Sequence, residues 1–245
     1  FLSDSLQELS RNWENLGSRI IIDKGNPLIL IPRLAKLIDA KFVVWNKAIE
    51  PYEIKRDSEI KNTLNNFKIE FIDLWDHLLV EPSQIFTGNN KPYSVYGPFY
   101  KKLKSNINLL NPQNNFNKIT NLKDLETGIE VSKKINSSKF LLEKLKKNIS
   151  FSGVNLCPCK PGELAAEKLL DQFISQEKIG SYNSSRDFPS QKGTSFLSAS
   201  LRFGTISIRK VWQATLMPEL INKNKNNQQS IETWQKELVW REFYQ

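Results

Sequence analysis

Four side chains near the end of the sequence are spaced so that one face of a helix could bind a planar base. Glu237, Trp240, Arg241 and Tyr244 fall at positions i, i+3, i+4 and i+7, which share one side of an α-helix. The indole could stack on a pyrimidine, the carboxylate could accept hydrogen bonds from base N–H groups, and the guanidinium could contact a phosphate. A buried aromatic stripe beside a surface Glu–Arg pair would show the same spacing, so these positions alone leave both interpretations open.

A second group of side chains could bind a phosphate. Thr194, Ser195 and Ser198 place three hydroxyls within five residues at a predicted helix start, around Phe196 and Leu197. Free backbone N–H groups and small hydroxyl donors at a helix start can hold a phosphate. Hydroxyl side chains also commonly cap helices, and capping is the simpler interpretation of the cluster taken alone.

The sequence does not support several other kinds of catalytic or cofactor site. His77 is the one histidine, so a histidine-based zinc site or a Ser-His-Asp triad is not supported, and we predict a surface loop residue. Cys157 and Cys159 are too close in sequence for an ordinary disulfide framework. The sequence has no Gly-x-Gly-x-x-Gly, which argues against a classical NAD site.

The charge of the chain is compatible with a polyanionic partner. The sequence holds 35 Lys and Arg against 26 Asp and Glu, a formal net charge of +9. Residues 100–150 hold eleven Lys and four acidic residues, so most of the excess lies in an Asn- and Lys-rich stretch typical of a solvated linker. A basic nucleic-acid-binding module without a cofactor is therefore one function that the composition allows.

The first part of the chain alternates predicted helices with short apolar strands. Periodicity predicts helices at 3–16, around Leu30, Leu34 and Leu37, and at 56–67, with strands at 19–22, 42–45 and 70–75. This alternation is typical of a parallel sheet with helices on both faces. Because the unit begins with a helix, we expect an earlier strand to be missing.

The later part of the chain has a different pattern. Tyr93, Tyr96 and Phe99 lie in a turn-rich aromatic stretch that predicts a packed loop. Residues 104–160 read as an inter-domain linker with a short helix near 141–145. A helical domain then begins at residue 161, and Ser207 is placed to cap a helix that carries Val211 and Trp212.

Two longer strings resemble known segments of a protein family. One runs from Tyr182 and Arg186 through Gly193-Thr-Ser-Phe-Leu-Ser-Ala-Ser-Leu-Arg-Phe-Gly204 to Arg209, and the other is Trp234-Gln-Lys-Glu-Leu-Val-Trp-Arg-Glu-Phe-Tyr244. Together they resemble class I cyclobutane pyrimidine dimer DNA photolyases of the photolyase/cryptochrome family, in particular the cyanobacterial kind. The resemblance runs through nearly the whole chain and is weakest between residues 104 and 159.

The resemblance implies a role for each candidate residue. The cofactor would be FAD, and the matching contacts are Tyr182, Thr194, Ser195, Phe196, Leu197 and Ser198. Glu237 and Trp240 match the residues that contact a thymine dimer. Arg186 and Arg241 would lie near the DNA backbone, and Tyr244 completes the lesion-binding face.

The resemblance also implies a site for an antenna chromophore. Glu50 and Arg56 match positions that approach a deazaflavin or methenyltetrahydrofolate in relatives. Ala48 stands where deazaflavin-type relatives carry an acid, so the chromophore is not assigned. A solvated loop after a strand is the alternative interpretation of this segment.

We therefore expect residues 1–103 to form a Rossmann-like parallel-sheet α/β domain, incomplete at its start. A linker over 104–160 would join it to the beginning of an all-α FAD-binding domain at 161–245. No apolar run could span a membrane, so we expect a cytoplasmic bacterial protein, and a monomer.

The expected function is that of a fragment of a light-driven lyase. The resemblance implies that this lyase splits cyclobutane dimers in UV-damaged DNA by electron transfer from excited reduced FAD. We expect residues 1–245 alone to bind FAD weakly or not at all, and to be inactive. A cryptochrome-type flavin photoreceptor without repair activity is the alternative.

Overall fold

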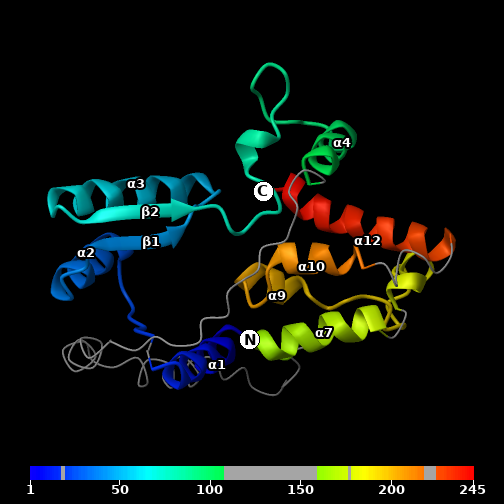
Figure 1. Cartoon of the computed structure of the whole chain (residues 1–245), viewed down its shortest axis with the longest axis horizontal. Helices are drawn as coiled ribbons and strands as arrows, with labels where there is room; N and C mark the ends of the chain where they lie inside the picture. Colours follow the sequence, from blue (N-terminus) through cyan, green and yellow to red (C-terminus); the bar gives the residue numbers. More distant parts are fainter. Residues whose placement is uncertain (18–19, 108–158, 176–177, 218–224) are drawn as a thin grey trace. The chain divides into compact units, whose positions relative to one another are not determined.

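The computed structural model describes residues 1–17, 20–107, 159–175, 178–217 and 225–245 (Figure 1). These residues fall into two compact units. The first holds residues 1–75, and the second holds the described residues from Asp76 onward. The helix predicted at 141–145, Cys157 and most of the predicted linker lie outside the described residues.

The first unit contains a two-stranded parallel sheet. Strands β1 (Phe42–Asn46) and β2 (Glu70–Leu74) pair in register from Phe42 opposite Glu70 to Asn46 opposite Leu74. Helix α3 (Pro51–Asn66) connects the strands, and helix α2 (Pro27–Leu37) precedes them. The two strands predicted here and the parallel connection between them are therefore confirmed.

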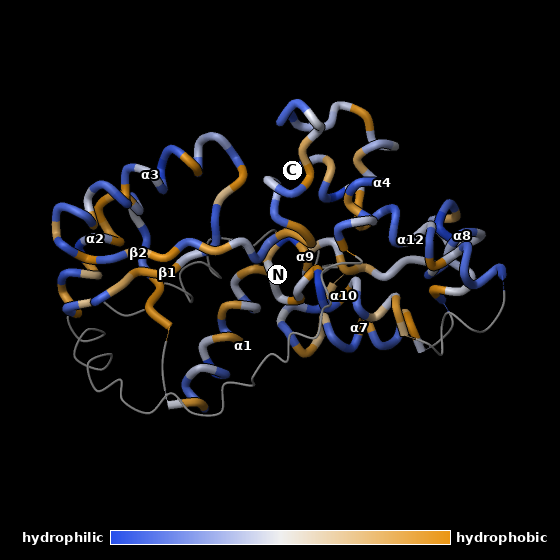
Figure 2. Tube along the Cα trace, turned by 45° about the horizontal axis from the view of Figure 1, so that its top comes forward, coloured by the Kyte–Doolittle hydropathy of each residue, from blue (hydrophilic) through white to orange (hydrophobic). Residues whose placement is uncertain are grey.

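Both of these helices pack on the same face of the sheet. The buried side chains Ala35, Ile60 and Leu64 come from α2 and α3 and contact Val43 and Phe71 of the strands. The opposite face is apolar and exposed, and the strands are coloured largely hydrophobic in Figure 2. Its exposed fractions are 56% for Phe42, 57% for Val44, 42% for Ile72 and 55% for Leu74. The prediction that helices cover both faces therefore does not hold for the described residues.

In this unit one predicted helix is present, one predicted strand is absent, and one helix begins earlier than predicted. Helix α1 (Leu2–Asn15) agrees with the predicted helix at 3–16. The strand predicted at 19–22 is wrong for the described residues 20–22, which have no strand structure. Their apolar run has the right composition, but a strand also requires a hydrogen-bonded neighbour. Helix α3 begins earlier than predicted because Pro51 suits its first turn.

The second unit is mainly helical. It contains η1 (Pro82–Gln84), α4 (Tyr96–Ile107), α7 (Glu163–Ser175), η2 (Ile179–Ser181), α8 (Tyr182–Ser185), α9 (Ser198–Phe203), α10 (Ile208–Ala214) and α12 (Lys225–Phe243). Helix α12 buries Trp234, Leu238 and Val239 in the core of this unit. Trp234 meets Phe173 of α7 with the ring centroids 4.8 Å apart. This buried face fixes the rotation of α12 and therefore which side chains its other face presents.

Residues 76–107 pack with the helical unit. Leu79, Val80, Leu103 and Ile107 belong to the same core as α7, α10 and α12. The predicted α/β domain ended at residue 103, whereas the contacts divide the chain after Trp75. The aromatic stretch predicted as a packed loop does pack against this core, but from Tyr96 onward it is helix α4.

Candidate functional site

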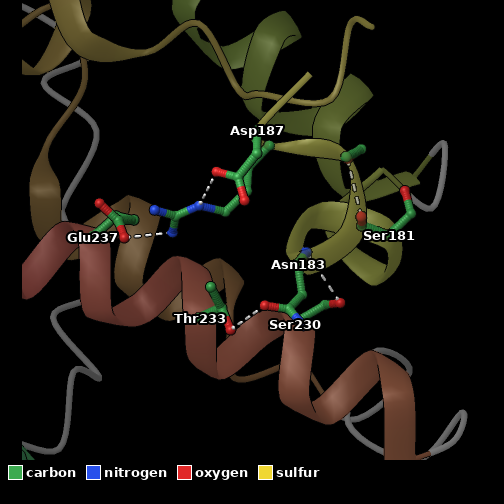
Figure 3. A network of polar contacts seen from close by, with 8 residues as sticks. Ser181, Asn183, Asp187, Ser230, Thr233 and Glu237 are labelled. Atoms are coloured by element: carbon green, nitrogen blue, oxygen red, sulfur yellow. Dashed lines mark hydrogen bonds and ion pairs between the residues drawn. The ribbon is translucent and has the colours of Figure 1, made fainter. Parts of the chain in front are cut away.

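An ion pair joins two of the candidate residues. Arg186, directly after α8, places Nη1 2.5 Å from Oε1 of Glu237 on α12. Its Nε lies 3.4 Å from Oδ1 of Asp187, and its guanidinium lies 5.6 Å from the centre of the Tyr182 ring. Figure 3 shows Asp187 and Glu237 with the dashed lines that mark these two ion-pair contacts. The hydrogen bond to Glu237 raises the pKa of the Arg186 guanidinium, which therefore stays charged.

The partner of Glu237 differs from the one that the structural interpretation of its spacing predicts. A surface Glu–Arg pair within the helix would join Glu237 to Arg241, but Glu237 instead contacts Arg186, 51 residues away in sequence. Arg241 contacts Glu242 and His77. Glu237 is 37% exposed at its side chain, so a ligand can still reach the carboxylate.

Trp240 lies outside the buried core of the helical unit and forms part of an aromatic stack. Tyr96 of α4 covers one face of the indole, with ring centroids 3.6 Å apart and planes 6° apart. Tyr244 stacks on Trp240 at 5.4 Å and 21°, and is itself 76% exposed. Phe243 meets the indole edge-on at 5.6 Å. Trp240 is therefore half-buried, and three neighbouring aromatic rings restrict the movement of its indole.

Arg241 is held on the other side of the end of α12. Its Nη1 donates to the carbonyl oxygen of His77 at 3.1 Å and to Oε1 of Glu242 at 2.7 Å, and its Nη2 lies 2.8 Å from Nε2 of His77. A guanidinium has five N–H donors, so others remain for a phosphate. His77 lies in a loop, as predicted, but it is only partly exposed because it contacts Arg241 of α12.

Glu242 is a buried acid that the sequence analysis did not single out. Its side chain is 3% exposed, and Oε2 accepts a hydrogen bond from the backbone N–H of Leu79 at 2.7 Å. Burial raises the pKa of Glu242 to about 7, although the Leu79 N–H and Arg241 partly oppose this shift. Glu242 therefore ties residues 77–79 to the end of α12, close to Trp240.

The predicted cofactor residues Thr194 to Ser198 come directly after Gly193, at which the chain packs closely against α8. Gly193 is buried against Ser185 of α8, so close that a Cβ at Gly193 would lie 2.4 Å from the Ser185 Oγ. Phe196 has a left-handed backbone with φ of 56° and is 41% exposed, while Leu197 is 2% exposed. The thiol of the buried Cys159 lies 3.2 Å from the Phe196 carbonyl oxygen and donates to it. These contacts fix the course of the chain that carries Thr194 and Ser195.

The capping interpretation of the hydroxyl cluster does not hold. Leu197 is the N-cap residue of α9, and no side chain caps this helix. Thr194 and Ser195 are partly exposed and Ser198 is exposed, so their hydroxyls are open to a ligand. Hydroxyl donors on a fixed backbone suit the phosphate and polyol parts of FAD, and the residues present therefore fit that group.

Tyr182 occupies a different position from the hydroxyl cluster. It is 8% exposed, belongs to the core, and meets Phe173 edge-on at 5.9 Å. Burial raises the pKa of the Tyr182 phenol, which keeps its hydroxyl protonated. The Tyr182 ring therefore lies under the Arg186 guanidinium, and this guanidinium in turn contacts Glu237.

The two antenna candidates lie in the first unit. Glu50 is exposed and is the N-cap residue of α3, without a side-chain cap. Arg56 contacts Asp57 at 2.7 Å and Glu53 at 3.9 Å. Arg56 and Asp57 line a cavity of about 590 Å³ whose other walls come from α2, β1, α3 and the loop between α2 and β1.

Tyr96 is the functional candidate that sequence reasoning missed. Tyr96, Phe99, Tyr100 and Leu103 recur at helical spacing, which was a signal for helix α4. That spacing could not show that Tyr96 lies flat against Trp240, because the two residues are far apart in sequence.

Comparison with known proteins finds that the chain is similar to members of the photolyase family. The DNA photolyase family model matches residues 1–117. The deoxyribodipyrimidine photo-lyase of Synechococcus sp. (strain ATCC 27144) is 37% identical over 254 residues, which cover all of this chain and 49% of that protein. An uncharacterised 31.6 kDa protein from Synechococcus sp. (strain PCC 6716) is 33% identical over 99% of this chain and 81% of its own length. The chain thus spans about half the length of the photo-lyase.

Solved structures show the same fold. A bacterial class III photolyase from Agrobacterium tumefaciens matches 99% of this chain and 48% of its own, with a TM-score of 0.72 and 28% identity. A cryptochrome from Synechocystis sp. PCC6803 has the same coverage, a TM-score of 0.71 and 19% identity, which shows a shared fold alone.

The part of the chain that the structure describes contains no cluster of three or more His, Cys, Asp or Glu residues able to hold a metal ion. None of its helices is both long and apolar enough to cross a membrane.

The buried carboxyl of Glu242 predicts a pH-dependent stability. Its pKa is raised from an ordinary 4.5 to about 7 on folding, so the native state binds more protons between these values. The free energy of unfolding should therefore fall as the pH rises from 4.5 to 7, by up to roughly 3 kcal/mol. Glu242→Gln should remove this dependence, because the amide still accepts from Leu79 but does not titrate.

Chemical denaturation at a series of pH values measures this effect. Glu163→Gln, an exposed change in α7, is the control and should keep the wild-type pH dependence. Parallel curves for the wild type and Glu242→Gln between pH 4.5 and 7 would contradict the assignment.

The contact of Gly193 with Ser185 predicts a steric cost at this position. In Gly193→Ala the new Cβ would lie 2.6 Å from the Ser185 Cβ and 3.0 Å from its backbone carbonyl carbon. The free energy of unfolding should fall by about 1–3 kcal/mol, as for other overpacked sites. Gly88→Ala, which meets nothing within 4 Å, is the matched control. Equal stability of the two variants would show that the close contact is absent.

Proposed function

Because the chain belongs to the DNA photolyase family, we propose that it contributes the lesion-binding face and part of the cofactor site of a light-driven DNA repair lyase. The substrate would be a cyclobutane pyrimidine dimer in UV-damaged DNA. The observation that carries the proposal is the Arg186–Glu237 pair beside the half-buried Trp240. It brings a carboxylate, a cation and an indole together on one side of α12.

The chain's own residues would perform recognition and positioning. The indole of Trp240 offers a flat apolar surface for an extrahelical base, and Glu237 can accept hydrogen bonds from base N–H groups. Arg186 holds this carboxylate in place and, with Arg241, adds positive charge for the phosphate backbone. The exposed Tyr244 extends the aromatic surface at its outer edge.

The cofactor would be held by the segment that follows Gly193. The hydroxyls of Thr194, Ser195 and Ser198 would bind the polar parts of FAD. The side chains of Phe196, Leu197 and Tyr182 would form the walls around them. When bound and reduced, FAD supplies the light-driven electron-transfer chemistry that splits the dimer, so the protein itself needs no acid, base or nucleophile for that step.

An antenna chromophore is proposed for the first unit. Support comes from the cavity that Arg56 and Asp57 line together with apolar side chains of α2 and β1. A deazaflavin and methenyltetrahydrofolate are the two candidates. Glu50 lies at the exposed start of α3.

A cryptochrome-type photoreceptor is the second candidate function. The likeness to a cryptochrome structure favours it at the level of the fold. Glu237 and Trp240 favour repair, since a protein that only signals has no need of a base-binding pair.

Repair under blue light separates the two functions. The protein at its native length, reconstituted with FAD and reduced, should convert a thymine-dimer oligonucleotide to undamaged thymines in blue light and leave it unchanged in the dark. The product is measured by chromatography. Bound flavin with no light-dependent repair would contradict the lyase function and favour the photoreceptor.

Glu237→Gln predicts a specific loss of dimer recognition. The substitution keeps the shape of the side chain but removes its charge and the ion pair with Arg186. The affinity for a dimer-containing oligonucleotide should fall about tenfold, as expected when a charged hydrogen bond is lost. Fluorescence anisotropy titration with damaged and undamaged strands measures the change.

Glu232→Gln is the matched control for this variant. It removes one negative charge from the same helix, at a site that contacts Lys104 and not Arg186. Both variants should therefore bind undamaged DNA alike. An equal loss of dimer affinity in both would mean that Glu237 has no specific contact with the lesion.

A further inference from the structure

Tyr96 lies flat against Trp240, closer than any other aromatic pair in the described residues. The ring centroids are 3.6 Å apart and the planes differ by 6°. Tyr96 belongs to α4 and Trp240 to α12, two helices of the same unit that contact each other (Figure 1). One face of the indole is therefore fully occupied by a tyrosine ring.

The Tyr96 ring is held on several sides. Its hydroxyl donates to the carbonyl oxygen of Lys236 at 3.0 Å, one helical turn before Trp240. Tyr100 stacks on it from α4 at 5.9 Å and 26°, and Phe243 meets it edge-on at 5.8 Å. Burial raises the pKa of the Tyr96 phenol, so the hydroxyl remains a donor at physiological pH. The ring is thus anchored to α12 at the level of the indole that it covers.

These contacts make the two stacking partners of the indole unequal. Tyr96 covers one face of the ring and is anchored. Tyr244 stacks on the same indole less closely, at 5.4 Å and 21°, and is 76% exposed. A base that approaches Trp240 can therefore displace Tyr244 at little cost, whereas Tyr96 is held by its own hydrogen bond and by two neighbouring rings.

We propose that Tyr96 is a positioning residue for lesion binding: it fixes the plane of Trp240, so that a flipped pyrimidine stacks on the indole face that Tyr96 does not cover. This assignment rests on the proposed function and adds a residue to it. Its mechanism is the loss of rotational freedom of the indole before the base arrives, which lowers the entropy cost of binding. A flat ring is required, because a branched aliphatic side chain would fill the space without setting the plane.

Three variants test this assignment in the protein at its native length. Tyr96→Phe keeps the flat ring and loses the hydroxyl, Tyr96→Leu keeps apolar volume and loses the flat face, and Tyr52→Leu makes the same change at an exposed tyrosine of the first unit. The measurement is the ratio of the dissociation constants for undamaged and dimer-containing oligonucleotides. Near-UV circular dichroism reports the stacked rings, and thermal unfolding reports folding.

The expected results differ for each variant. Tyr96→Phe and Tyr52→Leu should keep the wild-type ratio within about twofold, whereas Tyr96→Leu should lower it about tenfold, the scale of one base–aromatic stack. Affinity for undamaged DNA should stay unchanged, and the circular dichroism of the stack should be lost in Tyr96→Leu alone. If Tyr96→Leu does not unfold cooperatively, Tyr96→Met takes its place, because an unbranched thioether fills irregular space.

Three outcomes would overturn the assignment. An unchanged ratio in Tyr96→Leu would mean that Tyr96 only packs. A higher ratio would mean that Tyr96 blocks the face that the base uses. Absence of discrimination in the wild type would overturn the proposed function itself, and this assignment with it, so the two failures are distinguishable.

Discussion

The ion pair between Arg186 and Glu237 is the contact on which the candidate site depends. At 31% and 37% side-chain exposure it adds little to the stability of the fold, because solvent screens an exposed pair. Its importance is geometric. It holds a carboxylate of α12 beside Trp240, and it holds the cation over Tyr182, the residue proposed to contact the cofactor. One arginine therefore links the two halves of the proposed site.

The rest of the helical unit supports the position of this pair. Trp234, Leu238 and Val239 fix the rotation of α12 from its buried side. Glu242 ties the end of the same helix to Leu79, and the contact of Gly193 with Ser185 fixes the hydroxyl-bearing chain beside α8. A recognition surface of few residues is thus built on a packed core, and its side chains lose little freedom when a ligand binds.

The sequence allowed some of this site to be predicted. Periodicity placed Glu237 and Trp240 on one side of a helix, and Ser207 was recognised as a cap, which its hydrogen bond to the Arg209 N–H confirms. The partners of these residues could not be predicted, because they are far away in the sequence. Arg186 is 51 residues from Glu237, and Tyr96, which covers Trp240, is 140 residues from its hydrogen-bond acceptor Lys236. The strand predicted at 19–22 failed for a related reason, since strand formation depends on a neighbouring strand that local composition does not reveal.

A double-mutant cycle on Arg186 and Glu237 tests the central claim most directly. The affinity for a dimer-containing oligonucleotide is measured for the wild type, Arg186→Gln, Glu237→Gln and the double variant. If the arginine acts by holding the carboxylate against the lesion, the two effects should be coupled by about 1 kcal/mol or more, with the double variant little worse than Glu237→Gln. Strictly additive effects would mean that the two residues contact DNA independently, and would contradict this account of the site.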